Sequence, residues 1–314
     1  MTSNNTTASS DYSKGMRRPV LFNVLVCLLI PSLTCSIYLF FQFATNHILR
    51  KQIHNRITLF LLIAYFLQAI TDIPFMLSLL HHGNVYQSEF FCQLWILADY
   101  ILNVVSLLLV FYCSIERYIM VFHHRFFISH VTLLHYIPIG FCFMYPTTFY
   151  IIVLFCYPCT TTFSYDMYTC GGPCYLFDVR VSAFDKLAHI FVPVVGTIFV
   201  SSILLWRIIR QKQRIEQQNT WKNNRRITWQ ILSVCCLHTV AWGPIVTIML
   251  MVLFSPVSNP GLVHVLINWF PCSYFLVILI YPFICLIGLT KIWLDVCKSL
   301  RRQLRLIKNT AGLE

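Results

Sequence analysis

The chain has 314 residues, of which 58% are hydrophobic and 11% are charged, and its formal net charge is +12 at pH 7. Soluble domains carry about 25% charged residues, so the composition excludes a soluble globular protein and indicates an integral membrane protein. Membrane topology and anionic lipids account for the excess of positive charge, and we do not expect nucleic acid among the partners.

The first segment, residues 1–19, is polar, and we predict that it forms an extracellular N-terminal tail. It contains two overlapping N-glycosylation sequons, at Asn4 and Asn5. Glycosylation at these positions requires that the tail lies outside the cell, so this prediction depends on the orientation derived below.

Seven apolar runs follow, and each is long enough to cross a hydrocarbon core of about 30 Å as a helix. Backbone polar groups in lipid must be satisfied within their own segment, so helices are the default structure and prolines are tolerated as kinks. The runs lie at about 20–43, 57–80, 91–121, 133–157, 187–210, 228–254 and 263–288. The sequence therefore predicts an all-α membrane protein, a seven-transmembrane helix bundle over residues 20–288.

Lys and Arg are distributed unequally between the two sides of the predicted bundle. The segments assigned to the cytoplasm hold 18 of the 23 Lys and Arg residues, and the segments on the other side hold 5. Cytoplasmic segments carry such an excess, so we expect a cytoplasmic C-terminus and, with seven crossings, an extracellular N-terminus. The predicted location is the plasma membrane, with membrane lipids as partners.

The third apolar run joins a cysteine to a charged tripeptide. Cys92 lies near its start, and Glu116-Arg117-Tyr118 closes it. The 25 residues from Cys92 to Arg117 rise by roughly 37 Å as a helix, which is enough to cross a membrane with some tilt. A bilayer tolerates an ionised pair only at an interface or facing the bundle interior. The pair is therefore a candidate switch at the inner surface.

Four of the 14 cysteines, Cys92, Cys159, Cys170 and Cys174, are predicted to lie outside the cell in an oxidising compartment. Four thiols allow three pairings. We favour Cys92–Cys170, which would tie the outer loop to the third span, together with Cys159–Cys174; Cys92–Cys174 is the close competitor. A zinc site is the less favoured alternative, because no Cys-x-x-Cys pair is present and the residues between Cys170 and Cys174 are typical of a turn.

Asp99 lies seven residues after Cys92, about two helical turns into the bundle. A carboxylate there is costly unless it is paired or hydrated, and the candidate partners in other spans are His189 and His264. We therefore predict that Asp99 meets a cation from a ligand, with a polar link inside the bundle as the alternative. Residues on its helical stripe, spaced by about 3.6 residues, are Asn103, Ser106, Val110, Cys113 and Arg117.

The last segment, residues 289–314, is predicted to be an amphipathic helix followed by a cytoplasmic tail. Apolar residues recur at helical spacing over 291–307, and basic residues occupy the other faces. This pattern is typical of a helix that lies along a membrane surface. Cys297 within it is a candidate palmitoylation site, with an ordinary free thiol as the alternative.

Together these features resemble the rhodopsin-like G-protein-coupled receptors, over roughly residues 20–307. The joint spacing of the motifs is specific, although each motif alone is common. The residues that carry the resemblance are, in chain order, Cys92, Glu116-Arg117-Tyr118, Pro193, Ala241-Trp242-Gly243-Pro244 and Pro282.

The resemblance implies roles for the matched residues. Arg117 is expected to be held inward at rest and to engage a heterotrimeric G protein when the receptor opens, with Glu116 as its local restraining partner. Trp242 is expected to be the aromatic toggle below the ligand pocket. The prolines Pro244 and Pro282 belong to the same switch, because a kink lets one half of a helix swing.

The chain departs from the family pattern at several positions. Tyr65 stands where the family usually has an aspartate that binds sodium, and Ser201 replaces a usual tyrosine. The seventh-span motif Asn-Pro-x-x-Tyr is changed to Tyr281-Pro282-Phe283-Ile284-Cys285. These changes put sodium binding and the family's tyrosine relay into question.

In the family, an acid at the position of Asp99 pairs with the ammonium group of biogenic amines. Here Phe275 stands where amine receptors usually have a tyrosine, and the long outer loop fits a peptide better. We expect an extracellular ligand that is a peptide with a basic or amino-terminal group, ahead of a small amine. The residues expected to contact it are Asp99, Asn103, His189, Trp242 and Phe275.

The alternative from another class is a membrane transporter or channel with seven spans, which would need ionisable residues in several spans. Only Asp72 and Asp99 are acids clearly inside the predicted spans, which is few for an ion path. The sequence has no phosphate loop, paired-histidine metal motif or nucleophile elbow. We therefore expect neither an enzyme nor a cofactor or metal site.

Overall fold

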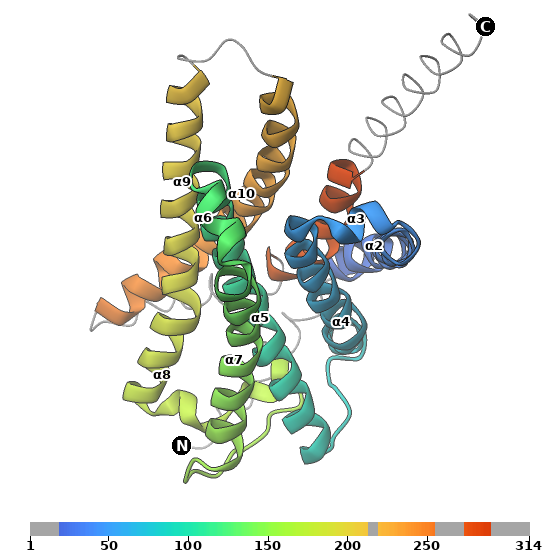
Figure 1. Cartoon of the computed structure of the whole chain (residues 1–314). Coiled ribbons are helices and arrows are strands. Elements are labelled where there is room, and N and C mark those ends of the chain that lie inside the picture. The colour runs from blue at the N-terminus through green and yellow to red at the C-terminus, as the bar shows by residue number, and fades with distance from the viewer. Residues whose placement is uncertain (1–18, 213–218, 255–272, 290–314) are drawn as a thin grey trace, which may run out of the picture.

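The computed structural model describes residues 19–212, 219–254 and 273–289, and this part of the chain consists of helices and their connections, without strands. Six of its helices are long and apolar enough to cross a membrane, and Ser273–Leu289 is a shorter apolar helix. Figure 1 shows these helices packed as a bundle. The predicted all-α bundle of seven transmembrane helices is confirmed.

The helices follow the predicted apolar runs, with ends that differ by a few residues. Two short helices, α3 (His47–Lys51) and α6 (His124–Ser129), follow the first and third spans. The longer helices are α2 Pro19–Thr45, α4 Ile53–His82, α5 Glu89–Phe122, α7 Ile137–Phe155, α9 Val192–Lys212, α10 Asn219–Phe254 and the last described helix, Ser273–Leu289.

Helix α5 is the central element of the bundle, since it packs against α4, α7, α9 and α10. The stripe predicted from its sequence is buried from Asp99 to Arg117, with every member 9% exposed or less. Buried polar groups need partners inside the bundle. Helix α5 therefore positions candidate functional groups near both of its ends.

Two π-helical turns lie directly before prolines. Thr132–Tyr136 leads into α7 two residues before Pro138, and Lys186–Phe191 leads into α9 two residues before Pro193. Proline has no N–H to donate, and a widened turn accommodates the missing hydrogen bond. Each turn carries one histidine that is buried in the bundle.

The fifth span begins earlier than the predicted residue 187. Helix α8 (Val179–Asp185) precedes the π turn, and the Asp178 carboxylate caps it by accepting hydrogen bonds from two backbone N–H groups of its first turn. The whole segment Val179–Arg210 is one candidate span. It brings Asp185 into the bundle, so the prediction that only two acids lie inside the spans is wrong.

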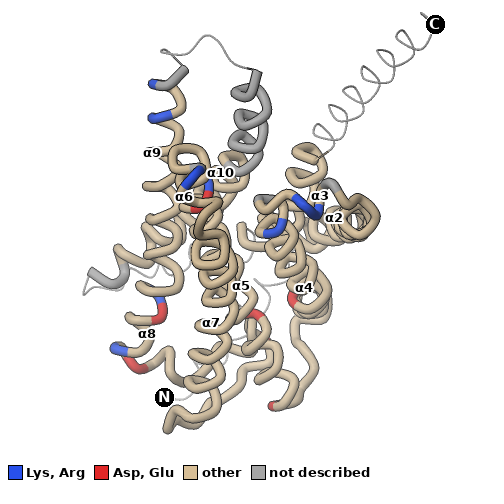
Figure 2. The backbone as a smooth tube through the Cα atoms, viewed as in Figure 1, with Lys and Arg blue, Asp and Glu red and all other residues tan. Residues whose placement is uncertain are grey.

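The two ends of the bundle differ in charge. We call the end that carries the disulfides Cys92–Cys170 and Cys159–Cys174 the disulfide end, and the opposite end, which carries Arg117, the arginine end. Figure 2 shows Lys and Arg gathered mainly at the arginine end, on α3, α6, the start of α4 and the last turns of α9. The predicted orientation, in which the arginine end is cytoplasmic, rests on this distribution and stays a prediction.

Some predicted features lie outside the described residues. They are the N-terminal tail with Asn4 and Asn5, the residue His264, and the C-terminal segment 290–314 with Cys297. The glycosylation sites, the surface helix and the palmitoylation site therefore stay predictions.

Candidate functional site

Two disulfides fasten the loop between α7 and α8 at the disulfide end. Cys92, at the start of α5, pairs with Cys170 across a Cα–Cα distance of 5.9 Å, and Cys159 pairs with Cys174 across 6.0 Å. This is the favoured pairing from the sequence, and it leaves none of these four thiols for a zinc ion. The backbone at Thr169 and Cys170 is left-handed, with φ of 46° and 51°, which costs roughly 1–2 kcal/mol per residue.

Tyr168, next to this strained backbone, reaches down to the acid that the sequence assigns to a ligand. Its hydroxyl donates a hydrogen bond to Asp99 Oδ1 at 2.8 Å. Burial raises the pKa of Tyr168 well above its usual value, so the hydroxyl stays protonated and able to donate. Asp99 is 3% exposed, and no Lys, Arg or His in the described part of the chain forms a salt bridge with it. A loop tyrosine therefore covers a buried carboxylate.

Aromatic rings surround this contact. The Tyr168 ring meets Trp95 and Phe275 edge to face, at centroid distances of 5.6 and 6.0 Å. Tyr274 packs against Phe275 at 5.3 Å and against Trp242 at 6.0 Å. Such pairs contribute about 0.5–1.5 kcal/mol each beyond the area they bury. The structure thus brings two predicted ligand residues, Trp242 and Phe275, into one buried cluster with the covered carboxylate.

Polar side chains from α4 and α5 line the same region. Asn103 lies one turn further along α5 than Asp99, and on α4 both Gln68 and Asp72 are fully buried. Gln68 Nε2 donates to the Tyr274 hydroxyl at 2.6 Å, and Asp72 lies close enough to Asp99 and Tyr274 to interact electrostatically. From the sequence we marked Asp72 only as an acid in a span and missed Gln68. Their spacing of four residues is the signal that places both on one helix face.

His189, the fifth predicted ligand residue, lies in a separate cluster. Its Nδ1 is 2.6 Å from Asp185 Oδ1, and its Nε2 is 3.0 Å from the Tyr145 hydroxyl. The hydroxyls of Tyr150 and Tyr175 donate to the two oxygens of Asp185 at 2.7 and 3.0 Å. Among the hydrogen bonds of the described residues, none joins this cluster to the carboxylate under the loop. A role for His189 in ligand contact stays a prediction.

At the arginine end, Glu116 is held by a histidine that sequence reasoning missed. His135, on the π turn before α7, places its Nδ1 2.7 Å from Glu116 Oε2, and both side chains are almost completely buried. Arg117 is 4% exposed, donates to Met120 Sδ at 3.8 Å and interacts electrostatically with Glu116 and Cys113. Glu116 and His135 are 19 residues apart on different helical segments, so the sequence pattern did not indicate this contact.

Tyr118, the last residue of the charged tripeptide, joins α5 to α9. The guanidinium of Arg207 lies 5.1 Å from the Tyr118 ring centroid and 5.2 Å from that of Phe122. Cation–π contacts at exposed sites contribute about 0.5–1 kcal/mol. This contact places the positive charge of Arg207 against the last turns of α5 at the arginine end.

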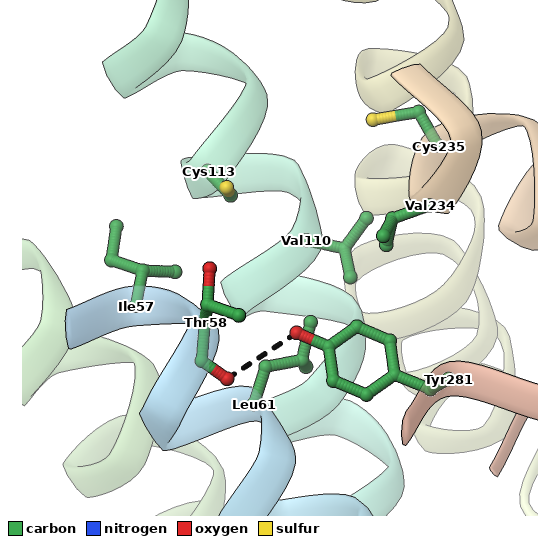
Figure 3. A pocket seen from close by; sticks show the side chains of 8 residues that line it. All are labelled: Ile57, Thr58, Leu61, Val110, Cys113, Val234, Cys235 and Tyr281. Carbon is green, nitrogen blue, oxygen red and sulfur yellow. Dashed lines mark hydrogen bonds between the residues drawn. The ribbon is translucent and has the colours of Figure 1, made fainter. Parts of the chain in front are cut away.

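A small cavity lies between α4, α5, α10 and the last described helix (Figure 3). Its volume is about 10 Å³, which is room for about one water molecule. The Tyr281 hydroxyl points toward α4 and donates to the Thr58 carbonyl oxygen at 3.3 Å. The lining is largely apolar, with Ile57 and Leu61 from α4, Val110 from α5 and Val234 from α10. The cavity is far too small for an organic ligand, so it is a packing gap between these helices.

Tyr65, which stands at the usual sodium-binding position, bridges two helices instead. Its hydroxyl lies 2.5 Å from His238 Nε2 on α10, and its ring lies 4.8 Å from the ring of Tyr281. Both Tyr65 and His238 are buried. His238 is a polar residue in the sixth span that we missed in the sequence, although it lies four residues before Trp242 on the same helix face.

The two switch prolines differ in their surroundings. Pro244 lies inside α10 and is exposed on the surface of the bundle, whereas Pro282 is buried in the last described helix. Neither follows a cis peptide bond. Their roles as kinks in moving helices stay predictions.

The comparison with protein families identifies the class of protein. The family model for the 7 transmembrane receptor (rhodopsin family) matches residues 35–285, which is most of the chain. The chain therefore belongs to the rhodopsin family of seven-transmembrane receptors. No curated protein matches it. The matched region contains the Asp99 cluster and Arg117, so both candidate sites lie within the receptor bundle.

Proposed function

We propose that this receptor binds an extracellular ligand with a cationic group, a peptide ahead of a small amine, and activates a heterotrimeric G protein. The observation that carries the proposal is the environment of Asp99, which is buried at the disulfide end, accepts a hydrogen bond from the Tyr168 hydroxyl and has no salt bridge to a Lys, Arg or His of the described residues. A carboxylate inside a membrane bundle is expensive without a positive partner. A ligand cation supplies that partner.

The ring contacts suggest how binding reaches the moving helices. A cation at Asp99 replaces the Tyr168 hydroxyl, and Tyr168 contacts Phe275, which in turn contacts Tyr274 and then Trp242. Trp242 lies two residues before Pro244 in α10. Ligand binding shifts the population toward an open arginine end only if the ligand prefers that arrangement.

The arginine end offers the groups for the cytoplasmic partner. Arg117 is always charged and must change partners rather than lose its charge. With Glu116 bonded to His135, the acid that restrains Arg117 is itself restrained. Arg207 and Arg210 at the end of α9 favour acidic partner surfaces and anionic lipid headgroups.

The test is ligand-dependent nucleotide exchange on purified G proteins, with the receptor in lipid nanodiscs and a panel of peptides and amines. We expect Asp99→Asn to weaken a cationic agonist by roughly tenfold or more. Arg117→Ala is expected to abolish exchange while ligand affinity changes by only a few fold. Uptake and conductance of the same ligand are measured in parallel.

Asp178→Asn is the matched control for Asp99→Asn, because Asp178 is an acid at the same end that lies outside the bundle core. It should leave potency unchanged. Undiminished exchange in Arg117→Ala, or ligand transport without exchange, would contradict the proposed function.

A further inference from the structure

Facing stripes of α4 and α5 carry polar atoms without hydrogen bonds. Gln68 and Asp72 are four residues apart on α4, and Trp95, Asp99 and Asn103 follow at the same spacing on α5. All five side chains are 8% exposed or less. Buried polar atoms in proteins are nearly always bonded, so an unbonded group of this size, near the covered carboxylate, points to a ligand.

The unbonded atoms are mostly acceptors. Within the described residues, Gln68 Oε1, both carboxylate oxygens of Asp72 and Asn103 Oδ1 have no hydrogen-bond partner, and Trp95 Nε1 is the one donor among these unbonded atoms. A ligand that satisfies them must therefore bring several donors. Ammonium and guanidinium groups consist of donors only.

Two acids lie in this group. Asp72 interacts electrostatically with Asp99, and no Lys, Arg or His of the described chain forms a salt bridge with either of them. Two neighbouring carboxylates in an apolar bundle repel each other when both are ionised. One bound positive charge compensates only one of them.

We infer that the Asp72–Asp99 pair is a binding site for a ligand with two positively charged nitrogen groups, one for each carboxylate. This inference rests on the proposed function and deepens it, because it specifies the charge of the ligand. Asp99 takes one cation after Tyr168 moves away. Asp72 takes the second, and Gln68 and Asn103 accept the remaining N–H groups.

Two sources share this chemistry: a free diamine, and the amino terminus of a peptide whose first residue is lysine. The amino-terminal ammonium group and the lysine ammonium group are then the two charges. The disulfide-linked loop above the site allows either source, and the test separates them.

The test uses the purified full-length receptor and two matched probe pairs. Cadaverine and pentylamine differ only in the second ammonium group, and so do lysyl-glycinamide and norleucyl-glycinamide. Apparent Kd values come from ligand-induced shifts of Tm. We expect the doubly charged member of at least one pair to bind roughly tenfold tighter or better than its singly charged match. The pair that shows this preference identifies the source.

Asp72→Asn should remove this preference and leave the singly charged probe unaffected. Asp99→Asn should weaken both members of the pair. If the preference survives in Asp72→Asn, or if singly and doubly charged probes bind equally well through Asp99, the two-charge site is wrong while the proposed function stands. If none of the four probes binds the unmodified receptor, the two-charge inference fails, and the proposed function is judged separately by the nucleotide-exchange panel.

The ligand-free receptor provides a second measurement. Since the Asp72 oxygens make no hydrogen bond among the described residues, Asp72→Asn should leave Tm unchanged or raise it. Proteins often carry such a stability cost at a binding site. A clear fall in Tm would mean that Asp72 supports the fold, and it would overturn the inference independently of any probe.

Discussion

Asp185 and Asp72 are both buried acids in membrane-spanning segments, yet their surroundings are opposite. Asp185 accepts hydrogen bonds from the hydroxyls of Tyr150 and Tyr175 and lies 2.6 Å from His189. Asp72 has no hydrogen-bond partner for either oxygen in the described part of the chain. The same residue type therefore serves two purposes: one acid holds elements together, and the other is open to a ligand.

The elements around each acid explain the difference. The partners of Asp185 come from α7, from the short helix Cys174–Phe177 and from the π turn of the same span. The carboxylate thus joins three segments at the disulfide end. Asp72 interacts electrostatically with a second acid, Asp99 on α5, and its contacts with the donors of Thr71 and Trp95 do not reach hydrogen-bond geometry. A satisfied buried network rigidifies a structure, whereas an unsatisfied one costs stability.

The largest expected effect comes from removing the partnered acid. Asp185→Asn should destabilise the receptor by about 3 kcal/mol or more, because three buried groups lose a charged acceptor. The measurement is Tm of the purified receptor in detergent. Tyr175→Phe removes one of these hydrogen bonds and should give an intermediate loss.

Asp72→Asn is the matched substitution, with the same change of atoms at similar burial. Equal losses of Tm in Asp185→Asn and Asp72→Asn would erase the distinction between the two acids. If Asp185→Asn cannot be purified, the loss of Tm in Tyr175→Phe can be compared with that in Asp72→Asn instead.

The bundle could be predicted from the sequence because its signals are local. Long apolar runs indicate directly that a segment lies in the membrane. The four cysteines outside the spans allow only three pairings, so the disulfides could also be predicted. The start of the fifth span was missed because polar residues such as Asp185 and Lys186 interrupt the apolar pattern. Their helix is supported by the Asp178 cap and by tertiary partners, which a hydropathy pattern does not contain.

Asp99 and Arg117 could be selected from the sequence because a charge inside an apolar run is conspicuous. Their environments could not be predicted. Tyr168, His135 and His238 act through contacts between segments far apart in the chain, such as the 69 residues between Tyr168 and Asp99. A histidine or tyrosine in an apolar run also has an ordinary packing role, so only the folded arrangement shows which ones bond to an acid or to another helix.

A smaller effect is expected at the pair of Tyr65 and His238, which is partnered like Asp185 but joins α4 to α10. Tyr65→Phe keeps the ring contact with Tyr281 and removes the hydrogen bond. A buried hydrogen bond contributes about 1 kcal/mol. We therefore expect ligand-independent nucleotide exchange to rise by about fivefold, since α10 is released from α4.

Tyr38→Phe is the control, because Tyr38 is 48% exposed on α2. It should leave basal exchange unchanged. A fall in basal exchange for Tyr65→Phe would mean that the hydrogen bond between Tyr65 and His238 belongs to the active arrangement of the helices. Hydrogen bonds between helices would then stabilise the active state as well as the resting state.

The smallest effect concerns Asp178, an acid that accepts hydrogen bonds like Asp185 but is only partly buried. Hydrogen bonds from the Tyr157 hydroxyl at 2.6 Å and from the backbone N–H groups of Arg180 and Val181 hold the pKa of Asp178 below its usual value. A lowered pKa means that the carboxylate stabilises the fold above the unfolded-state pKa, about 3.9, and that this contribution is lost as the pH falls through the folded-state value. Asp178→Ala should therefore lower Tm slightly at neutral pH, and the difference from the unmodified receptor should shrink as the pH falls below about 4. Tyr157→Phe should reproduce part of this pH dependence.

A Tm difference that stays constant with pH would show that Asp178 acts only as a neutral helix cap. Hydrogen-bond donors would then stabilise the ionised form of an acid only where water is excluded, as at Asp185.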